Sequence, residues 1–221
     1  MNEPVILEAL DQPEAPEVPP VLLNLGCGRN RIDEWINVDL DQPGHTPDVI
    51  MDLEAPLTEW LSHWDEDTVD GAQFIHCLEH LPGHLQVMEN LWHVLKPGGL
   101  VHVRCPHGAS DDAFEDPTHV NYFFPGSFHY YAQPTYWRAD YGYRGDFRVV
   151  DCLLIVPAQN PLLIGGQAPQ PPITNERLRH ERNVVLEMAI TMEAVKPIRE
   201  PKRELMDPIN ARVAPQQGTW S

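Results

Sequence analysis

The chain has 221 residues, 42% of them hydrophobic, which is enough for one domain with a proper core and tails. Its 33 acidic residues outnumber 15 basic ones, and the net charge of −18 disfavours binding to nucleic-acid phosphates. No apolar run approaches the roughly 20 residues that cross a membrane, and the N-terminus lacks the basic region and cleavage site of a signal peptide. We therefore expect a cytoplasmic protein, with no membrane segment, whose four widely spaced cysteines are reduced thiols.

Proline-rich segments divide the chain into three parts. Residues 1–19 are acidic and contain four prolines that block regular structure, so they predict a disordered arm. Residues 20–197 form the folded domain, which a Pro-rich loop interrupts at about 157–173. Residues 198–221 contain three more prolines and predict a C-terminal tail. The two Pro-rich arms would suit docking to a protein partner.

The first half of the domain alternates short apolar runs with helical or loop segments. The apolar runs predict strands at 21–25, 35–39, 48–53, 74–78 and 100–105. Helical spacing of Leu, Met and Trp predicts helices over 57–64 and 85–95, the second of which stops at Pro97-Gly98-Gly99. This alternation is typical of an α/β domain with a largely parallel sheet.

The end of the domain has a different pattern. Residues 147–156 form one long strand candidate. In residues 184–195, large apolar residues alternate with smaller or polar ones, and this period of two predicts a strand rather than a helix. We expect the two strands to close the sheet as an antiparallel pair.

Three successive strands end in residues that suit a nucleoside ligand, at the edge where open α/β sheets bind ligands. Gly26 and Gly28 follow the first strand, and without Cβ atoms they let the backbone approach a ligand. Asp39 ends the second strand, where an acid accepts hydrogen bonds from ribose hydroxyls. Asp52, with Leu53 beside it, ends the third and suits an adenine amino group and ring. A lone Gly-x-Gly is equally consistent with a tight turn. The two glycines therefore indicate a ligand site only in combination with Asp39 and Asp52.

The motifs LNLGCGRN, INVDLD, DLEAPL, DEDTVDGAQFIHCLEHL and LWHVLKPGGLVHVRCPH lie in that order within residues 21–107. Together they resemble the class I S-adenosylmethionine (SAM)-dependent methyltransferases of the type 11-like group, with a continuation to Val195. The resemblance implies an α/β, Rossmann-like fold with a mostly parallel seven-stranded sheet and an antiparallel last strand. It implies SAM as cofactor, with contacts from Asn24, Gly26, Cys27, Gly28, Asp39, Leu40, Asp52, Leu53 and His76.

Two features depart from the family. Asn24 stands where many members have an acid, and the segment between Gly28 and Asp39 leaves room for only a very short helix. An NAD site is the neighbouring alternative, but it requires a third glycine where this chain has Arg31, and an acid about 20 residues on. Since SAM has no pyrophosphate, the missing phosphate-binding helix counts less against SAM.

The acceptor side is expected in an aromatic insert at about 108–146, which contains all six tyrosines. Its Asp-Pro-Thr-His sequence at 116–119 resembles a subgroup found in phage genomes and bacterial envelope-polysaccharide clusters. The rings suit either a small aromatic core or an acceptor pocket. We expect oxygen methylation of a small molecule or saccharide, with His119 as first candidate for the base and His80 as second. A SAM-fold subunit without catalysis is the alternative.

Histidines are concentrated in the middle of the chain. Residues 76–80 match the H-x-x-E-H signature of zinc peptidases, but that motif needs a helix, and His76 falls on a predicted strand. Glu79 and His80, with His84 or His119, are candidates for a divalent cation, as in metal-dependent RNA 2′-O-methyltransferases. The full ligand set of those enzymes is missing and the acidic charge argues against RNA, so we assign no metal ligand. The simpler interpretation is that Glu79 and His80 orient a loop by hydrogen bonds.

Overall fold

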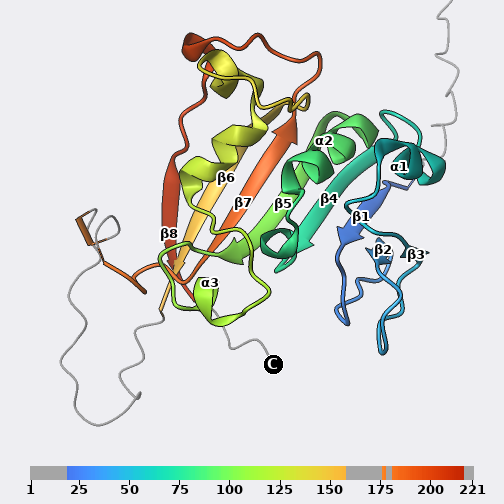
Figure 1. The fold of residues 1–221 in the computed structure, drawn as a ribbon, viewed down its shortest axis with the longest axis horizontal. Helices are drawn as coiled ribbons and strands as arrows, with labels where there is room; N and C mark the ends of the chain where they lie inside the picture. Colours follow the sequence, from blue (N-terminus) through green and yellow to red (C-terminus); the bar gives the residue numbers. More distant parts are fainter. Residues whose placement is uncertain (1–18, 158–175, 178–180, 217–221) are drawn as a thin grey trace, which may run out of the picture.

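The structure is a computed structural model that describes residues 19–157, 176–177 and 181–216. The expected N-terminal arm, apart from Pro19, and almost all of the expected Pro-rich loop lie outside these residues. The described residues form an eight-stranded sheet in the order β3-β2-β1-β4-β5-β7-β6-β8 (Figure 1). The α/β class predicted from the sequence is confirmed.

Five parallel strands form the first half of the sheet: β1 (Leu22–Leu25), β2 (Ile36–Asp39), β3 (Val49–Ile50), β4 (Val69–Ile75) and β5 (Leu95–Pro106). Their register places Leu25 opposite both Val38 and Phe74, so the carboxyl ends of β1, β2 and β4 are level. In Figure 1 the arrowheads of β1, β4 and β5 point to one edge, which the short helix α3 (Asp112–Glu115) also flanks. Residues that follow these strands therefore meet at this edge.

The last strands complete the sheet in a different way from the first five. β7 (Glu187–Ala194) lies between β5 and β6 (Phe147–Val156) and is antiparallel to both. The expected tail contains an additional strand, β8 (Ala211–Pro215), which pairs in parallel with β6. The sheet thus has eight strands rather than seven. Because β8 is an exposed edge strand, its sequence lacks the alternation that reveals a half-buried strand.

Several predicted boundaries were wrong for identifiable reasons. The strand predicted at 74–78 begins at Val69 and ends at Ile75, since His76 has φ +50° and leaves the extended conformation. The first half of this strand was not predicted, because it contains Asp70 and Gly71, residue types that are uncommon in strands. The strand predicted at 48–53 is reduced to two residues. The strand predicted at 100–105 begins at Leu95, because Leu95 already pairs with Val69. The register then shifts over the segment that contains Gly98 and Gly99, so that Leu100 pairs with Gly71.

The core lies on one side of the central strands. Helices α1 (Leu57–His63) and α2 (His84–Val94) contribute Trp60, Met88 and Leu91, which are fully buried. On β4 and β5, Phe74 and Val103 are equally buried, whereas the strand residues on either side of each, Gln73, Ile75, His102 and Arg104, are half-buried. None of the described helices is long and apolar enough to cross a bilayer.

The aromatic insert is largely part of this core. It contains two 3₁₀ helices, η2 (Pro125–Tyr131) and η3 (Gln133–Trp137). Five of its rings are buried: Phe123, Phe128, Tyr131, Tyr136 and Tyr143. The aromatic-core interpretation is therefore correct for these five. Other rings of the insert remain exposed: Phe114, Tyr122, Phe124, Tyr130, Trp137 and Tyr141.

A buried ion pair joins the insert to the C-terminal segment. Asp146 is fully buried and accepts hydrogen bonds from the Arg199 guanidinium at 2.8 and 2.9 Å, from the Arg199 amide and from the Gln133 amide. Arg199 also contacts Asp207 at 2.5 Å, close to the 3₁₀ turn η4 (Arg203–Leu205). This cluster fixes the chain that leads to β8.

Replacing Asp146 with Ala is expected to lower the free energy of unfolding by about 3 kcal/mol, because it leaves buried donors without their acceptor. Asp140 also pairs with an arginine, Arg144, but both side chains are exposed. Asp140→Ala should therefore destabilise the protein much less than Asp146→Ala does. Urea denaturation of both variants measures the difference, and equal effects would contradict the assignment.

Candidate cofactor-binding site

The glycine turn after β1 is constrained on one side and open on the other. Gly26 and Gly28 have φ +65° and +53°, in the left-handed region that favours glycine. A Cβ on Gly26 would lie within 2.2 Å of the Cys77 Sγ, so no side chain fits there. A Cβ on Gly28 would meet no atom within 4 Å. The turn therefore rests against the segment after β4 and leaves open space at Gly28.

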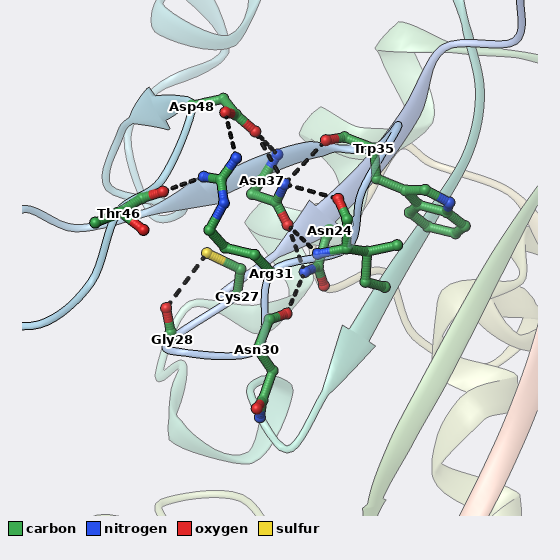
Figure 2. Close-up of polar contacts among 10 residues, drawn as sticks. Asn24, Cys27, Gly28, Asn30, Arg31, Trp35, Asn37, Thr46 and Asp48 are labelled. Carbon is green, nitrogen blue, oxygen red and sulfur yellow. Dashed lines mark hydrogen bonds and ion pairs between the residues drawn. The ribbon is translucent and has the colours of Figure 1, made fainter.

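A buried amide pair holds this turn in place (Figure 2). The Asn24 Nδ2 donates to the Asn37 Oδ1 and to the Asn30 carbonyl, both at 2.9 Å, and the Asn24 Oδ1 accepts from Gln73 at 2.9 Å. The Asn37 side chain in turn binds the main chain of Ile32 at its amide (2.8 Å) and its carbonyl (3.0 Å). These bonds organise residues 26–35, where the structure has a turn and no helix, not even the very short one expected.

Asp48 and Arg31 complete this network on its exposed side. Asp48 accepts from the amide and the side chain of Asn37, and pairs with Arg31 at 2.7 Å. The Arg31 guanidinium and the Asn37 donors lower the pKa of Asp48 to about 2. Arg31 also donates to the Thr46 carbonyl. The residue at the third-glycine position of an NAD motif is thus a structural anchor in this fold.

Asp39 is the acid nearest the open glycine. Its Oδ2 accepts from the Gly28 amide at 2.5 Å and its Oδ1 accepts from the Leu40 amide at 2.7 Å. The His45 Nδ1 lies 3.5 Å from the same Oδ2. Since each carboxylate oxygen has a further lone pair, Asp39 can accept two additional hydrogen bonds. It therefore sits where two adjacent hydroxyls of a ligand would find acceptors beside the glycine turn.

Asp52 and Leu53 follow β3 rather than ending it. Asp52 is exposed and its Oδ1 accepts from the Glu54 amide at 2.9 Å. Leu53 is buried, and its Cδ1 lies 3.9 Å from the position of a Cβ on Gly26. Leu40, after β2, is 43% exposed. The three residues supply an acid and apolar surface at the same edge as Asp39.

His76 stands between two buried glutamates just beyond β4. Its Nε2 lies 3.6 Å from the Glu187 Oε2 and its Nδ1 lies 3.5 Å from the Glu79 Oε1. The interactions with Glu187 first, and with Glu79 second, raise the pKa of His76 to about 9, so its imidazole is cationic at neutral pH. Arg104 on β5 binds the same Glu187 oxygen at 2.5 Å. The site thus contains two cations within the carboxyl edge of the sheet.

His80 and His119 come together across the segment that follows β5. Their rings are 4.7 Å apart, and one ligand atom each of Glu79, His80 and His119 lies within 4.8 Å of the others. His84 does not join them, since its Nδ1 bonds the Tyr131 hydroxyl at 2.8 Å. The H-x-x-E-H arrangement is not formed, because His76 follows a strand and His80 ends the 3₁₀ turn η1 (Leu78–His80).

Four residues that shape the site were not predicted from the sequence. Asn37 and Asp48 stabilise the glycine turn, and Arg104 and Glu187 fix the charge of His76. The sequence does point to Asn37, because it is a lone amide between two apolar residues of a strand. Nothing in the sequence points to Glu187, since the alternation of its strand predicts an exposed side chain. The structure nevertheless buries it.

No protein-family model matches the sequence, and no curated protein is similar enough to be counted as a relative. Among solved structures, a SAM-dependent methyltransferase from Archaeoglobus fulgidus superimposes with a TM-score of 0.53 at 18% identity, over 79% of this chain and 86% of that one. The chain has the Rossmann-like methyltransferase fold.

Two further solved structures are more distant. A Haloferax volcanii complex of the Trm112 methyltransferase activator with a putative methyltransferase gives a TM-score of 0.48 at 13% identity, over 83% of this chain and 86% of that one. A putative type 11 methyltransferase from Sulfolobus solfataricus gives 0.45 at 11% identity, over 80% and 85%.

Replacing Asn37 with Ala is expected to destabilise the protein by about 2–4 kcal/mol, because it removes one partner of the buried Asn24 amide and the side-chain partner of three main-chain groups, the Ile32 amide and carbonyl and the Trp35 carbonyl. Asn30 offers a matched control, since its side chain is exposed and only its main chain joins the network. Asn30→Ala should change stability by less than about 0.5 kcal/mol. Chemical denaturation followed by circular dichroism gives both values, and an Asn37 variant as stable as the control would refute the role of the network.

Proposed function

We propose that this protein is a SAM-dependent methyltransferase that methylates an oxygen of a small molecule or saccharide. The observation that carries the proposal is the open side of Gly28 next to the Asp39 carboxylate, at the carboxyl edge of a methyltransferase fold. Gly26 and Cys27 flank this space, and a bulkier residue at Gly26 is excluded by Cys77. The shape and the acceptors suit a nucleoside with a small substituent at its 5′ carbon.

The proposed positions of SAM follow the strand ends. The methionine part lies along Asn24, Gly26, Cys27 and Gly28, and the ribose hydroxyls donate to Asp39. Asp52 accepts from the adenine amino group, while Leu40 and Leu53 cover the ring. Of these residues Asn24 acts indirectly, since its amide group is already bonded to Asn30, Asn37 and Gln73. It positions the turn.

His76 contributes charge to this site. Its raised pKa keeps the imidazole cationic at neutral pH, and 39% of the side chain remains exposed. An exposed cation beside the glycine turn attracts the carboxylate of the methionine part. SAM supplies an already activated methyl group when it is bound, so the protein's contribution is to orient the acceptor in line with the breaking S–C bond.

The acceptor is proposed to bind beside the Asp116-Pro-Thr-His119 segment. The exposed rings of Phe114 and Tyr122 stack at 4.4 Å there, and an exposed ring pair suits the apolar face of a sugar. The net charge of −18 disfavours a polyanionic acceptor.

His119 is the proposed base and His80 the second candidate. The His119 Nδ1 faces the Ala113 carbonyl at 3.2 Å, an arrangement that protonates this nitrogen and leaves Nε2 with a free lone pair. The Nε2 is therefore the atom that would take the acceptor's proton. Because the His119 side chain is only 8% exposed, the acceptor must reach it through a narrow opening.

Calorimetric titration with SAM tests the cofactor assignment. We expect Asp39→Ala to weaken SAM binding about 10- to 100-fold, because it removes charge-assisted hydrogen bonds to the ribose. Asp41→Ala is the matched control: it removes an exposed acid two residues away and should leave the affinity unchanged. A folded protein that does not bind SAM would refute the proposed function.

Turnover tests the base. With an acceptor identified from a panel of saccharides and hydroxylated small molecules, His119→Ala is expected to lower the rate of S-adenosylhomocysteine release about 100-fold or more. The SAM affinity should stay within about twofold, since His119 lies outside the proposed cofactor contacts. Loss of SAM binding instead would contradict this role. Tight SAM binding without methyl transfer to any acceptor would favour a non-catalytic subunit.

A further inference from the structure

Two segments that are far apart in the sequence are joined at the acceptor side of the site. The Glu79 carbonyl accepts hydrogen bonds from the amides of Val120 (2.9 Å) and Asn121 (3.1 Å), and the Asn121 side chain donates to the Leu81 carbonyl at 2.8 Å. These bonds hold the Asp-Pro-Thr-His segment against the turn after β4. They bring one ligand atom each of Glu79, His80 and His119 within 4.8 Å of one another.

The Glu79 carboxylate lacks the partners that burial normally requires. The residue is 2% exposed, and neither of its carboxylate oxygens accepts a hydrogen bond from any residue that the structure describes. The His76 imidazole lies 3.5 Å from Oε1, too far for a hydrogen bond with good geometry. A buried carboxylate is stable only when it is paired or coordinates a cation.

Both histidines present a free nitrogen because neighbouring groups fix their tautomers. The Thr118 hydroxyl donates to the Asp116 Oδ1 at 2.6 Å, and it therefore accepts from the His80 Nδ1 at 2.9 Å, while the Thr118 carbonyl is a second, longer acceptor for the same nitrogen at 3.3 Å. The Ala113 carbonyl can only accept, so the His119 Nδ1 is protonated as well. Each imidazole keeps its Nε2 lone pair. Such orientation by a carbonyl or a carboxylate relay is typical of metal-bound histidines.

We infer that Glu79, His80 and His119 bind one divalent first-row transition-metal ion. Bonds of about 2.1 Å to a tetrahedral ion separate its ligand atoms by about 3.4 Å, so side-chain shifts of about 1 Å complete the site. Two imidazoles and one carboxylate favour ions such as Zn²⁺, Co²⁺ or Fe²⁺ over Mg²⁺. Three protein ligands leave coordination positions open.

The ion's binding rests on this geometry alone, whereas its role in the reaction rests on the proposed function. In an open position the ion would make an acceptor hydroxyl more acidic, so that the hydroxyl would lose its proton to solvent. Its oxygen would then form a bond to the methyl carbon while the S–C bond of SAM breaks, with S-adenosylhomocysteine as the leaving group. In the metal-free protein the same His119 Nε2 is the base proposed above.

Titration of the chelator-treated full-length chain with Co²⁺, followed by its visible absorption, tests the site. We expect one equivalent to bind, Zn²⁺ to displace it, and millimolar Mg²⁺ to leave it in place. Glu79→Gln, which keeps the size of the side chain, should weaken binding at least tenfold, and His63→Ala, which removes an exposed histidine of α1, should not. Wild-type protein that binds no Co²⁺, or a Glu79 variant that binds it equally well, would overturn the inference.

Thr118 offers a second readout that a general loss of stability would not mimic. Thr118→Val removes the hydroxyl that orients His80 and should lower Co²⁺ affinity about 10-fold, whereas Thr118→Ser should retain it. SAM titration of the same samples separates the two proposals. Lost metal binding in protein that binds SAM overturns the metal site alone, and metal binding without SAM binding overturns the proposed function alone.

Discussion

The hydrogen bond between the buried side chains of Asn24 and Asn37 is the interaction on which the candidate site depends. The connection from β1 to β2 is short and contains no helix that could hold this segment. The Asn37 side chain holds it instead, since it binds Asn24 on β1, the Ile32 main chain in the connection, and Asp48. Because both amides are buried, the hydrogen bonds are shielded from water and the turn is fixed in one conformation.

The same edge of the sheet holds a cluster of buried and half-buried charged side chains. Glu187, Arg104 and His76 form one ionic chain from β7 to the end of β4, and Glu79 lies at its far end. Asp146 and Arg199 form a separate buried pair whose role is to anchor the aromatic insert. The two groups differ in the hydrogen bonding of their carboxylates. Both Asp146 oxygens accept hydrogen bonds, whereas within the described residues neither Glu79 oxygen does. The hydrogen-bonded carboxylate stabilises the fold, and the carboxylate without hydrogen bonds marks the place where we propose a ligand.

The sequence predicted the parallel half of the sheet well, because Val21 to Leu25 and Phe74 belong to buried strands whose apolar runs are unambiguous. It located Gly26, Gly28 and Asp39 for the same reason, since polar residues directly after such runs fall at the carboxyl edge. It could not predict β8, an exposed edge strand without alternation. Nor could it reveal that Thr118 orients His80 or that Glu187 holds His76, because these contacts join residues 38 and 111 positions apart.

The open space beside Gly28 and Asp39 is the proposed cofactor site. The most direct measurement is the change in amide ¹H–¹⁵N NMR spectra when S-adenosylhomocysteine is added to the full chain. We expect the amides of Gly28 and Leu40, which both donate to Asp39, to shift strongly and saturably, and the amides of β6 and β8 to stay unchanged. Unchanged Gly28 and Leu40 amides at saturating ligand, or shifts confined to another part of the sheet, would contradict it.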